Sequence, residues 1–227
     1  MRSTDAFAGL DGRGGALMQA GALRPYEHSL RTAGPLGLRA DDGRVISLDI
    51  ARWLAPVDDI DETVLVRCTG PVLDVGCGPG RFVAALAERG IAAMGLDIAE
   101  TAVSLTRRRG LPAVLRSVFA PIPGEGRWPT VLLMDGNIGI GGDPHRLLER
   151  VRTLLAPDGR LVVETAPDAH ADEQLSVRFT QRGQPIGPTF DWAHVGLLPL
   201  LRHTGVLGFG VPEAWSAGGR TFASFPR

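Results

Sequence analysis

From residue 71 onward, short apolar runs alternate with amphipathic stretches, and Gly, Pro or Asp residues separate them. The apolar runs predict strands at 71–75, 91–97, 113–117, 130–135 and 160–165. The amphipathic stretches predict helices at 80–89, 99–109 and 143–155. Because strands that alternate with helices form a parallel sheet with helices on both faces, we expect a doubly wound α/β fold from residue 71 to 227.

The first third of the chain has a weaker pattern. Residues 1–24 are rich in Gly and Ala without a sustained period, which predicts a flexible arm. Residues 25–70 are helical in short pieces, with one helix expected over 46–54 and another capped by Asp58 and running towards Cys68. This segment is predicted to form a helical lid over the α/β domain.

The C-terminal part predicts a further helix and a hairpin. Residues 192–204 have a helical pattern that Pro199 interrupts. Two later runs, 206–211 and 220–225, have the character of strands. They are expected to pair as a hairpin at the edge of the sheet.

Composition narrows the class of protein. The 227 residues, 44% of them apolar, are enough for one domain with a hydrophobic core. With 25 acidic and 24 basic residues, the chain lacks the basic excess that nucleic-acid and membrane-surface binding require, so neither partner is expected. No stretch approaches the roughly 20 apolar residues of a membrane span, and the N-terminus lacks the apolar core of a signal peptide. A cytoplasmic protein is expected.

Two residue types limit the possible chemistry. All basic residues are arginine, which is typical of a GC-rich bacterial genome and excludes a Schiff-base or P-loop lysine. The two cysteines, Cys68 and Cys77, have neither disulfide-framework nor zinc-ligand spacing. We therefore expect no bound metal.

The strongest local signal is a glycine-rich turn, Gly76, Gly78 and Gly80, between a predicted strand and a helix. Glycine lets the backbone adopt positive φ and approach a ligand closely. The next strand ends at Asp97, where a carboxylate can accept hydrogen bonds from ribose hydroxyls. In the dinucleotide fingerprint the third glycine falls one position later, at Arg81, so the spacing disfavours NAD.

Three segments together resemble a known family. They are LDVGCGPG (73–80), GLD (95–97) and LLAPDGRLVVE (154–164). These segments resemble the core of the class I, Rossmann-like, S-adenosylmethionine-dependent methyltransferases. The resemblance implies a seven-stranded, mostly parallel sheet with an antiparallel last strand, and S-adenosyl-L-methionine bound across the carboxyl ends of the strands.

The resemblance also assigns roles in cofactor binding. It places under the cofactor the loop of Gly76, Cys77, Gly78, Pro79 and Gly80. It implies that Asp74 reaches the methionine ammonium group, that Asp97 holds the ribose hydroxyls and that Ile98 packs on the adenine. Many relatives have an acid after the third strand, but this chain has Ser117 and Val118 there, so adenine recognition would use these two residues instead.

Candidates for the acceptor side come from three places. Asp135 and Asn137 follow the fourth strand and face either the methionine ammonium or the acceptor. Tyr26 and His28 in the lid, and Trp192 and His194 in the later helix, are predicted to line the acceptor pocket. If the acceptor arrives protonated, His28, His194 or Asp135 would serve as the base.

We therefore expect a methyltransferase, monomeric or homodimeric, that acts on a small-molecule acceptor. The chain lacks the Asp/Asn-Pro-Pro-aromatic sequence with which many enzymes hold the amine of a nucleobase. Two alternatives remain. One is a non-catalytic protein that binds S-adenosylmethionine or S-adenosylhomocysteine, and the other, disfavoured by the glycine spacing and the missing Tyr-x-x-x-Lys pair, is an NAD-dependent oxidoreductase.

Overall fold

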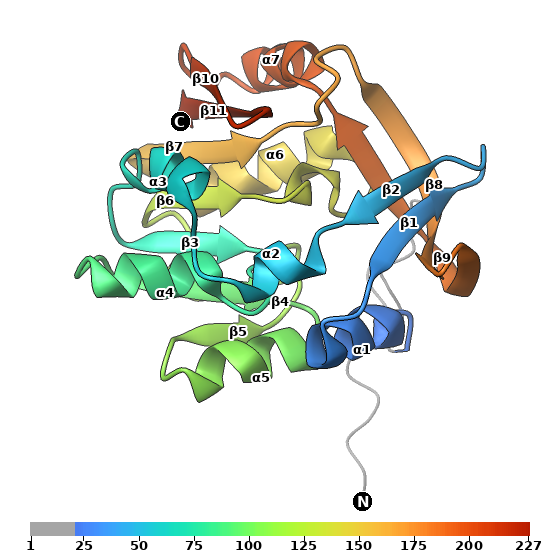
Figure 1. Ribbon diagram of the computed structural model, residues 1–227. Coiled ribbons are helices and arrows are strands. Elements are labelled where there is room, and N and C mark those ends of the chain that lie inside the picture. Colours follow the sequence, from blue (N-terminus) through green and yellow to red (C-terminus); the bar gives the residue numbers. More distant parts are fainter. Residues whose placement is uncertain (1–20) are drawn as a thin grey trace, which may run out of the picture.

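The computed structural model describes residues 21–227, which form two β-sheets with flanking helices (Figure 1). The helices are α1 (Arg24–Thr32), α2 (Ile50–Leu54), α3 (Asp59–Leu65), α4 (Arg81–Glu88), α5 (Glu100–Arg108), the 3₁₀ turn η1 (Asn137–Gly139), α6 (Pro144–Leu154) and α7 (Leu197–Val206). The strands are β1 (Leu36–Ala40), β2 (Val45–Leu48), β3 (Val72–Val75), β4 (Ala93–Asp97), β5 (Ala113–Leu115), β6 (Trp128–Leu133), β7 (Leu155–Glu164), β8 (Asp172–Gln181), β9 (Gln184–Val195), β10 (Glu213–Ala217) and β11 (Arg220–Pro226). None of the helices in this described part is long and apolar enough to cross a membrane.

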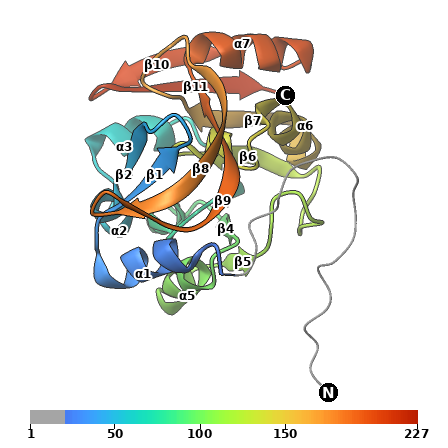
Figure 2. The same ribbon diagram turned by 90° about the vertical axis from the view of Figure 1, so that its right-hand side faces the viewer.

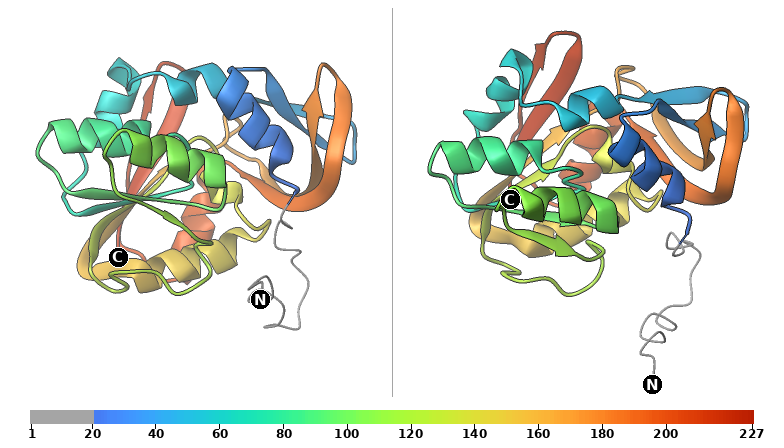
Figure 3. Two further views of the ribbon diagram at one scale, coloured as in Figure 1. Left: turned by 90° about the horizontal axis from the view of Figure 1, so that it is seen from below. Right: turned by 60° about the horizontal axis from the view of Figure 1, so that its bottom comes forward.

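The larger sheet has seven strands in the order β10-β11-β7-β6-β3-β4-β5. Strands β3 to β7 run parallel, and β11 pairs antiparallel with β7. Helices α4 and α5 cover one face of this sheet, and α6 and α7 cover the other (Figure 3). The predicted doubly wound sheet with an antiparallel last strand is thus confirmed.

The smaller sheet has four antiparallel strands in the order β2-β1-β8-β9. It joins two distant parts of the sequence, because Leu38 of β1 lies opposite Phe179 of β8. The sheet stands across the ends to which the parallel strands point, on the right of Figure 1 and in front in Figure 2. It therefore covers the end of the large sheet where doubly wound folds bind their ligands.

The N-terminal prediction needs correction. Most of the expected arm, residues 1–20, lies outside the described residues, and α1 begins at Arg24. The segment 25–70 contains strands β1 and β2 as well as helices, so it is not a helical lid. The predicted helix at 46–54 is a strand followed by a short helix, because Asp49 accepts a hydrogen bond from the Arg52 N–H and starts α2 only there.

The C-terminal prediction was also partly wrong. Residues 192–195 end strand β9, and the helix begins only at Leu197, so Pro199 lies in its first turn, where no intrahelical N–H is needed. The stretch 206–211 is not a strand, and the strand before β11 is β10, six residues or so further on. The predicted edge hairpin exists, with Trp215 opposite Phe222.

Three apolar clusters hold these layers together. One fills the space between the large sheet and the α6–α7 face and includes Leu133 and Phe225. The second, with Phe82 and Phe222, packs α3 and α4 on the opposite face. The third joins the small sheet to α1 and α5 and includes Phe179. Since all three clusters include fully or nearly fully buried side chains, both sheets have a packed core of their own.

Candidate functional site

A cavity opens between the carboxyl ends of the parallel strands and the small sheet. The glycine-rich turn after β3, the end of β4 and the segments after β5 and β6 form one side. The small sheet, with α1 and α2, forms the other. The cavity therefore lies between segments that are far apart in the sequence, at the position expected of a ligand site in this fold.

The glycine-rich turn has the positive φ angles that its sequence predicts. Gly76, Gly78 and Gly80 have φ angles of 72°, 55° and 81°. A Cβ atom on Gly80 would lie 2.7 Å from the Thr106 side chain, and one on Gly76 would lie 2.5 Å from Asn137 Nδ2. Only glycine fits at these two positions, where both the φ angle and the space exclude a side chain.

The side chain of Asn137 is hydrogen-bonded to the backbone at the start of this turn. Its Nδ2 donates hydrogen bonds to the carbonyl oxygens of Val75, at 2.8 Å, and Gly76, at 3.0 Å. The amide therefore links the segment after β6 to the end of β3. Asn137 positions the glycine-rich turn and leaves only its Oδ1 atom free of these contacts.

Asp97 receives two backbone hydrogen bonds at the edge of the cavity. Its Oδ2 accepts from the Gly78 N–H at 2.9 Å and its Oδ1 from the Ala99 N–H at 2.8 Å. Burial raises the pKa of Asp97 to about 6, against the lowering effect of these N–H groups. At neutral pH the carboxylate is ionised and each oxygen keeps a lone pair for a further donor.

Asp74 is the most unusual group of the cavity wall. Its side chain is buried, with 2% exposure, and no residue of the described chain donates a hydrogen bond to it. Burial, with the negative charges of Asp135 and Asp97, raises the pKa of Asp74 to about 8. A buried carboxylate without a donor is costly, so this position calls for a cation or a strong donor from a ligand.

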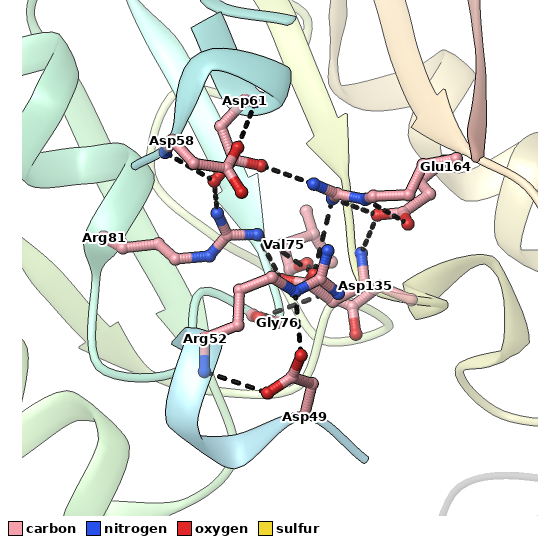
Figure 4. Close-up of polar contacts among 11 residues, drawn as sticks. Asp49, Arg52, Asp58, Asp61, Val75, Gly76, Arg81, Asp135 and Glu164 are labelled. Atoms are coloured by element: carbon pink, nitrogen blue, oxygen red, sulfur yellow. Dashed lines mark hydrogen bonds and ion pairs between the residues drawn. The ribbon is translucent and has the colours of Figure 1, made fainter. Parts of the chain in front are cut away.

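A buried ion-pair network closes the cavity beside Asp135. Arg81 at the start of α4 pairs with Asp61 of α3 and, at 2.8 Å, with Asp135 (Figure 4). Arg52 of α2 donates to the other side of the same carboxylate at 2.8 Å. Both oxygens of Asp135 thus accept from guanidinium groups, so this carboxylate is engaged in the structure.

The network continues to the edge of the large sheet. Arg220 of β11 pairs with Asp61 at 2.8 Å and with Glu164 of β7 at 2.7 Å. Glu164 also accepts from the Asp135 backbone N–H at 2.8 Å. Burial raises the pKa of Glu164, but the hydrogen bonds and charge of Arg220 more than offset this and hold it below its usual value. The network therefore ties α2 and α3 to the ends of β6, β7 and β11.

Tyr26 brings α1 to the opposite side of the cavity. Its hydroxyl oxygen lies 3.3 Å from the position that a Cβ on Gly78 would occupy, and its ring meets Trp53 edge to face at 6.1 Å. Burial, then the negative charge of Asp97 and its neighbours, raises the Tyr26 pKa well above 10. The phenol stays protonated at every physiological pH and can act there as a hydrogen-bond donor.

Comparison with known proteins identifies the family to which this chain belongs. A family model described as a methyltransferase domain matches residues 47–184, which include the glycine-rich turn and the strands around it. The chain belongs to this methyltransferase family. The family resemblance predicted from the sequence is confirmed.

Relatives and solved structures agree with this assignment. The chain is 30% identical over 128 residues to Trans-aconitate 2-methyltransferase of Paracidovorax citrulli, and 29% identical over 101 residues to Ubiquinone biosynthesis O-methyltransferase of Bordetella avium. These matches cover 54% and 41% of this chain, and the chain spans only 49% and 42% of the two relatives. A SAM-dependent methyltransferase from Bacteroides fragilis, solved with S-adenosyl-L-homocysteine, has the same fold. It shows 20% identity, a TM-score of 0.76, and coverage of 92% of this chain and 97% of that chain.

Most of the predicted site residues of the methyltransferase domain lie at the cavity. The lining includes Tyr26, Asp74, Gly76, Cys77, Gly78, Pro79, Asp97, Ile98, Ser117, Val118, Asp135, Asn137 and Trp192. Gly80 lies just behind it, as the N-cap of α4.

Two predicted catalytic residues do not line the cavity. His28 is exposed on α1, and His194 on β9 lies 3.5 Å from Glu173 of β8. Helical geometry explains the first case, since successive residues of a helix point about 100° apart and Tyr26 takes the inward position. The structure gives neither histidine a position from which to take a proton in the cavity.

Several lining residues were not predicted from the sequence. Arg81 was named only as the residue that breaks the dinucleotide fingerprint, and Trp53 was not among the candidate site residues. Phe179 and Phe190 come from strands β8 and β9, which were not predicted at all. The alternation of Leu175, Val177 and Phe179 was the available signal, because period-2 alternation is typical of a half-buried strand.

Proposed function

We propose that this domain binds S-adenosyl-L-methionine in the cavity and transfers the methyl group to a small-molecule acceptor. The observation that carries the proposal is Asp74, a buried carboxylate without a hydrogen-bond donor beside a glycine-rich turn. A ligand with a cationic group at this point would pair with the Asp74 carboxylate, to which the protein itself donates no hydrogen bond. The ammonium group of the methionine part has this chemistry.

The other lining residues fit the rest of the cofactor. The open backbone of Gly76 and Gly78 leaves room for a ligand that any side chain would exclude. Asp97 would accept hydrogen bonds from ribose hydroxyls with the lone pairs that its backbone donors leave. Ile98, 40% exposed at the cavity, offers an apolar surface to the adenine ring, and Ser117 offers a hydroxyl.

Bound there, S-adenosylmethionine would supply an electrophilic methyl group on a positively charged sulfur. The chain's contribution is then alignment and exclusion of water, and alignment alone can give effective molarities of about 10⁵–10⁸ M. Asp74 and Asp97 face the cofactor, Asp135 is bound by arginines and Tyr26 stays protonated. Asp191 of β9 is the remaining carboxylate of the described lining, so it would take the acceptor's proton unless the acceptor is nucleophilic on its own.

The small sheet and α1, which cover the cavity, favour a small acceptor. The small sheet and α1 stand across the strand ends (Figure 2), which leaves a partly covered cavity rather than an open groove for a polymer. Both curated relatives are named for small molecules, and this supports the same acceptor class for the present chain.

The proposal is tested by transfer of a labelled methyl group. Purified protein is incubated with S-adenosylmethionine carrying a deuterated methyl group and a low-molecular-weight bacterial extract, and products are read by mass spectrometry. We expect at least one metabolite to gain the labelled methyl group, and none with the Asp74→Ala variant. Tight binding of S-adenosylhomocysteine without any labelled product would instead favour the non-catalytic binding protein.

A further inference from the structure

The wall of the cavity formed by the small sheet and α2 is mostly apolar and largely aromatic. It is lined by Leu38, Leu48, Trp53, Phe179, Phe190 and Trp192. The ring centroids of Phe179 and Phe190 lie 5.0 Å apart, and Phe190 meets Trp192 edge to face at 6.4 Å. Such a wall favours flat, apolar ligands, whose rings can stack on or meet these side chains edge to face.

The charges around this wall do not favour an anionic acceptor. Asp74 and Asp97 lie on the side of the glycine-rich turn, and Arg81 is neutralised by Asp61 and Asp135. A carboxylate acceptor would thus find no excess positive charge here to offset its desolvation.

Over the whole described lining, four aspartates stand beside three arginines. They include Asp191 of β9, Arg116 after β5 and Arg146 of α6, whose guanidinium group lies 4.5 Å from the centre of the Phe119 ring. The lining therefore offers no excess positive charge. An acceptor without a net negative charge fits it best.

One polar atom of this wall has no partner. Trp53 is a residue of the cavity wall. Its Nε1–H group is buried and makes no hydrogen bond within the described chain. By contrast, Trp215 Nε1 donates to Thr63 Oγ1 at 2.9 Å and Trp128 Nε1 to the Pro123 carbonyl at 3.1 Å. Buried indole N–H groups normally find an acceptor, so the free one at Trp53 indicates an acceptor atom on the ligand.

We propose that the methyl acceptor is a ring-bearing molecule without net negative charge, whose ring packs on the wall of the small sheet and whose oxygen or unprotonated nitrogen accepts a hydrogen bond from Trp53 Nε1. This rests on the proposed methyltransferase function and narrows its acceptor class. Trp53 is then a residue that determines acceptor specificity.

The test follows the four indole N–H resonances of the protein labelled with ¹⁵N-tryptophan, in the presence of S-adenosylhomocysteine. The Trp53 signal is assigned by its loss in the Trp53→Phe variant. Two sets of probes are added: phenols, hydroxyquinolines and indoles in one, and aliphatic di- and tricarboxylates in the other. We expect members of the ring-bearing set to move the Trp53 resonance, while Trp128 and Trp215, outside the cavity, do not respond.

Turnover gives the second measurement. With a ring-bearing acceptor that is methylated, Trp53→Phe keeps the aromatic wall but loses the donor, so the acceptor KM should rise roughly three- to tenfold. The KM of S-adenosylmethionine should not change. Trp215→Phe is the matched control, since Trp215 stacks on Phe222 away from the cavity, and should leave both constants unchanged.

The outcomes separate this inference from the proposed function. Carboxylates that move the Trp53 resonance or are methylated in preference to rings would overturn the inference, and so would a ring-bearing set that leaves Trp53 unmoved. Calorimetry of S-adenosylhomocysteine on the same sample tests the function itself. If that ligand binds while no ring compound does, the acceptor class alone is wrong, and if it does not bind, the proposed function fails.

Discussion

Replacing Arg81 with methionine is expected to destabilise the protein by about 3 kcal/mol, the largest effect on folding among the substitutions considered. The guanidinium group is only 3% exposed and joins Asp61, which is fully buried, to Asp135. Its loss leaves Asp61 with Arg220 as its one remaining guanidinium partner. Removing one member of a buried ion pair costs more than the pair itself contributes, because the remaining charge stays desolvated.

Equilibrium unfolding in guanidinium chloride, followed by circular dichroism, measures this loss. The control is Arg89→Met at the C-cap of the same helix, because Arg89 forms a half-exposed pair with Glu62 and its loss should cost no more than about 1 kcal/mol. Adding Asp61→Leu to Arg81→Met should recover part of the lost stability, since it removes the buried charge. Equal stabilities of the Arg81 and Arg89 variants would contradict the network described here.

The affinity for S-adenosylhomocysteine is expected to fall roughly ten- to thirtyfold between pH 7.5 and pH 6. The pKa of Asp74 without ligand is about 8, and a bound ammonium group would lower it. Ligand binding then releases a proton, so the affinity falls as the pH drops below the pKa of the free protein. Isothermal titration calorimetry in buffers of different ionisation enthalpy measures both the affinity and the released proton.

Asp74→Asn is the matched variant for this pH dependence. It cannot titrate, so its weaker affinity should hardly change over the same pH range, although the ligand's own groups titrate as before. The same change should stabilise the ligand-free protein at pH 7.5. Between about pH 4 and pH 8 the folded chain holds one proton more at Asp74 than the unfolded chain, so stability falls as the pH rises. A pH profile shared by both proteins would remove Asp74 from the ligand site.

The glycine-rich turn and Asp97 could be predicted because their chemistry is local. Three glycines in five residues require positive φ whatever the rest of the fold does, and an acid at the end of the next parallel strand must lie beside them. Asp74, one residue before the end of β3, follows from the same geometry. The parallel strands of the large sheet and helices α4, α5 and α6 were predicted for a similar reason, since each has a clear hydrophobic period.

The small sheet that covers the cavity could not be predicted in the same way, because it is built from strand pairings over long distances in the sequence. Strand β9 contains Pro185, Gly187 and Pro188, which are poor strand residues and are tolerated here because β9 lies at the edge of its sheet. Nothing local indicates that this strand, through β8, would join β1. The acceptor side of the cavity depends on that pairing.

The ion-pair network could not be predicted for the same reason, because its partners are far apart in the sequence. Arg52 and Asp135 are 83 residues apart, and Arg220 and Asp61 are 159 apart. Sequence patterns identify each charge but not its partner. Asp135 was therefore predicted as a free carboxylate in the cavity, while the structure places two guanidinium groups against it.

The central claim, that the cavity binds S-adenosylmethionine through Asp97 and the glycine-rich turn, is tested most directly by calorimetric titration of S-adenosylhomocysteine into the wild-type protein and Asp97→Asn. The variant keeps the shape of the side chain but loses the charge and one acceptor, so affinity should fall roughly ten- to hundredfold. Asp172→Asn, on the surface beside Arg202, should bind like the wild type, and NAD should not bind to either protein. Equal affinities of the wild type and Asp97→Asn, or binding of NAD in place of S-adenosylhomocysteine, would contradict the account.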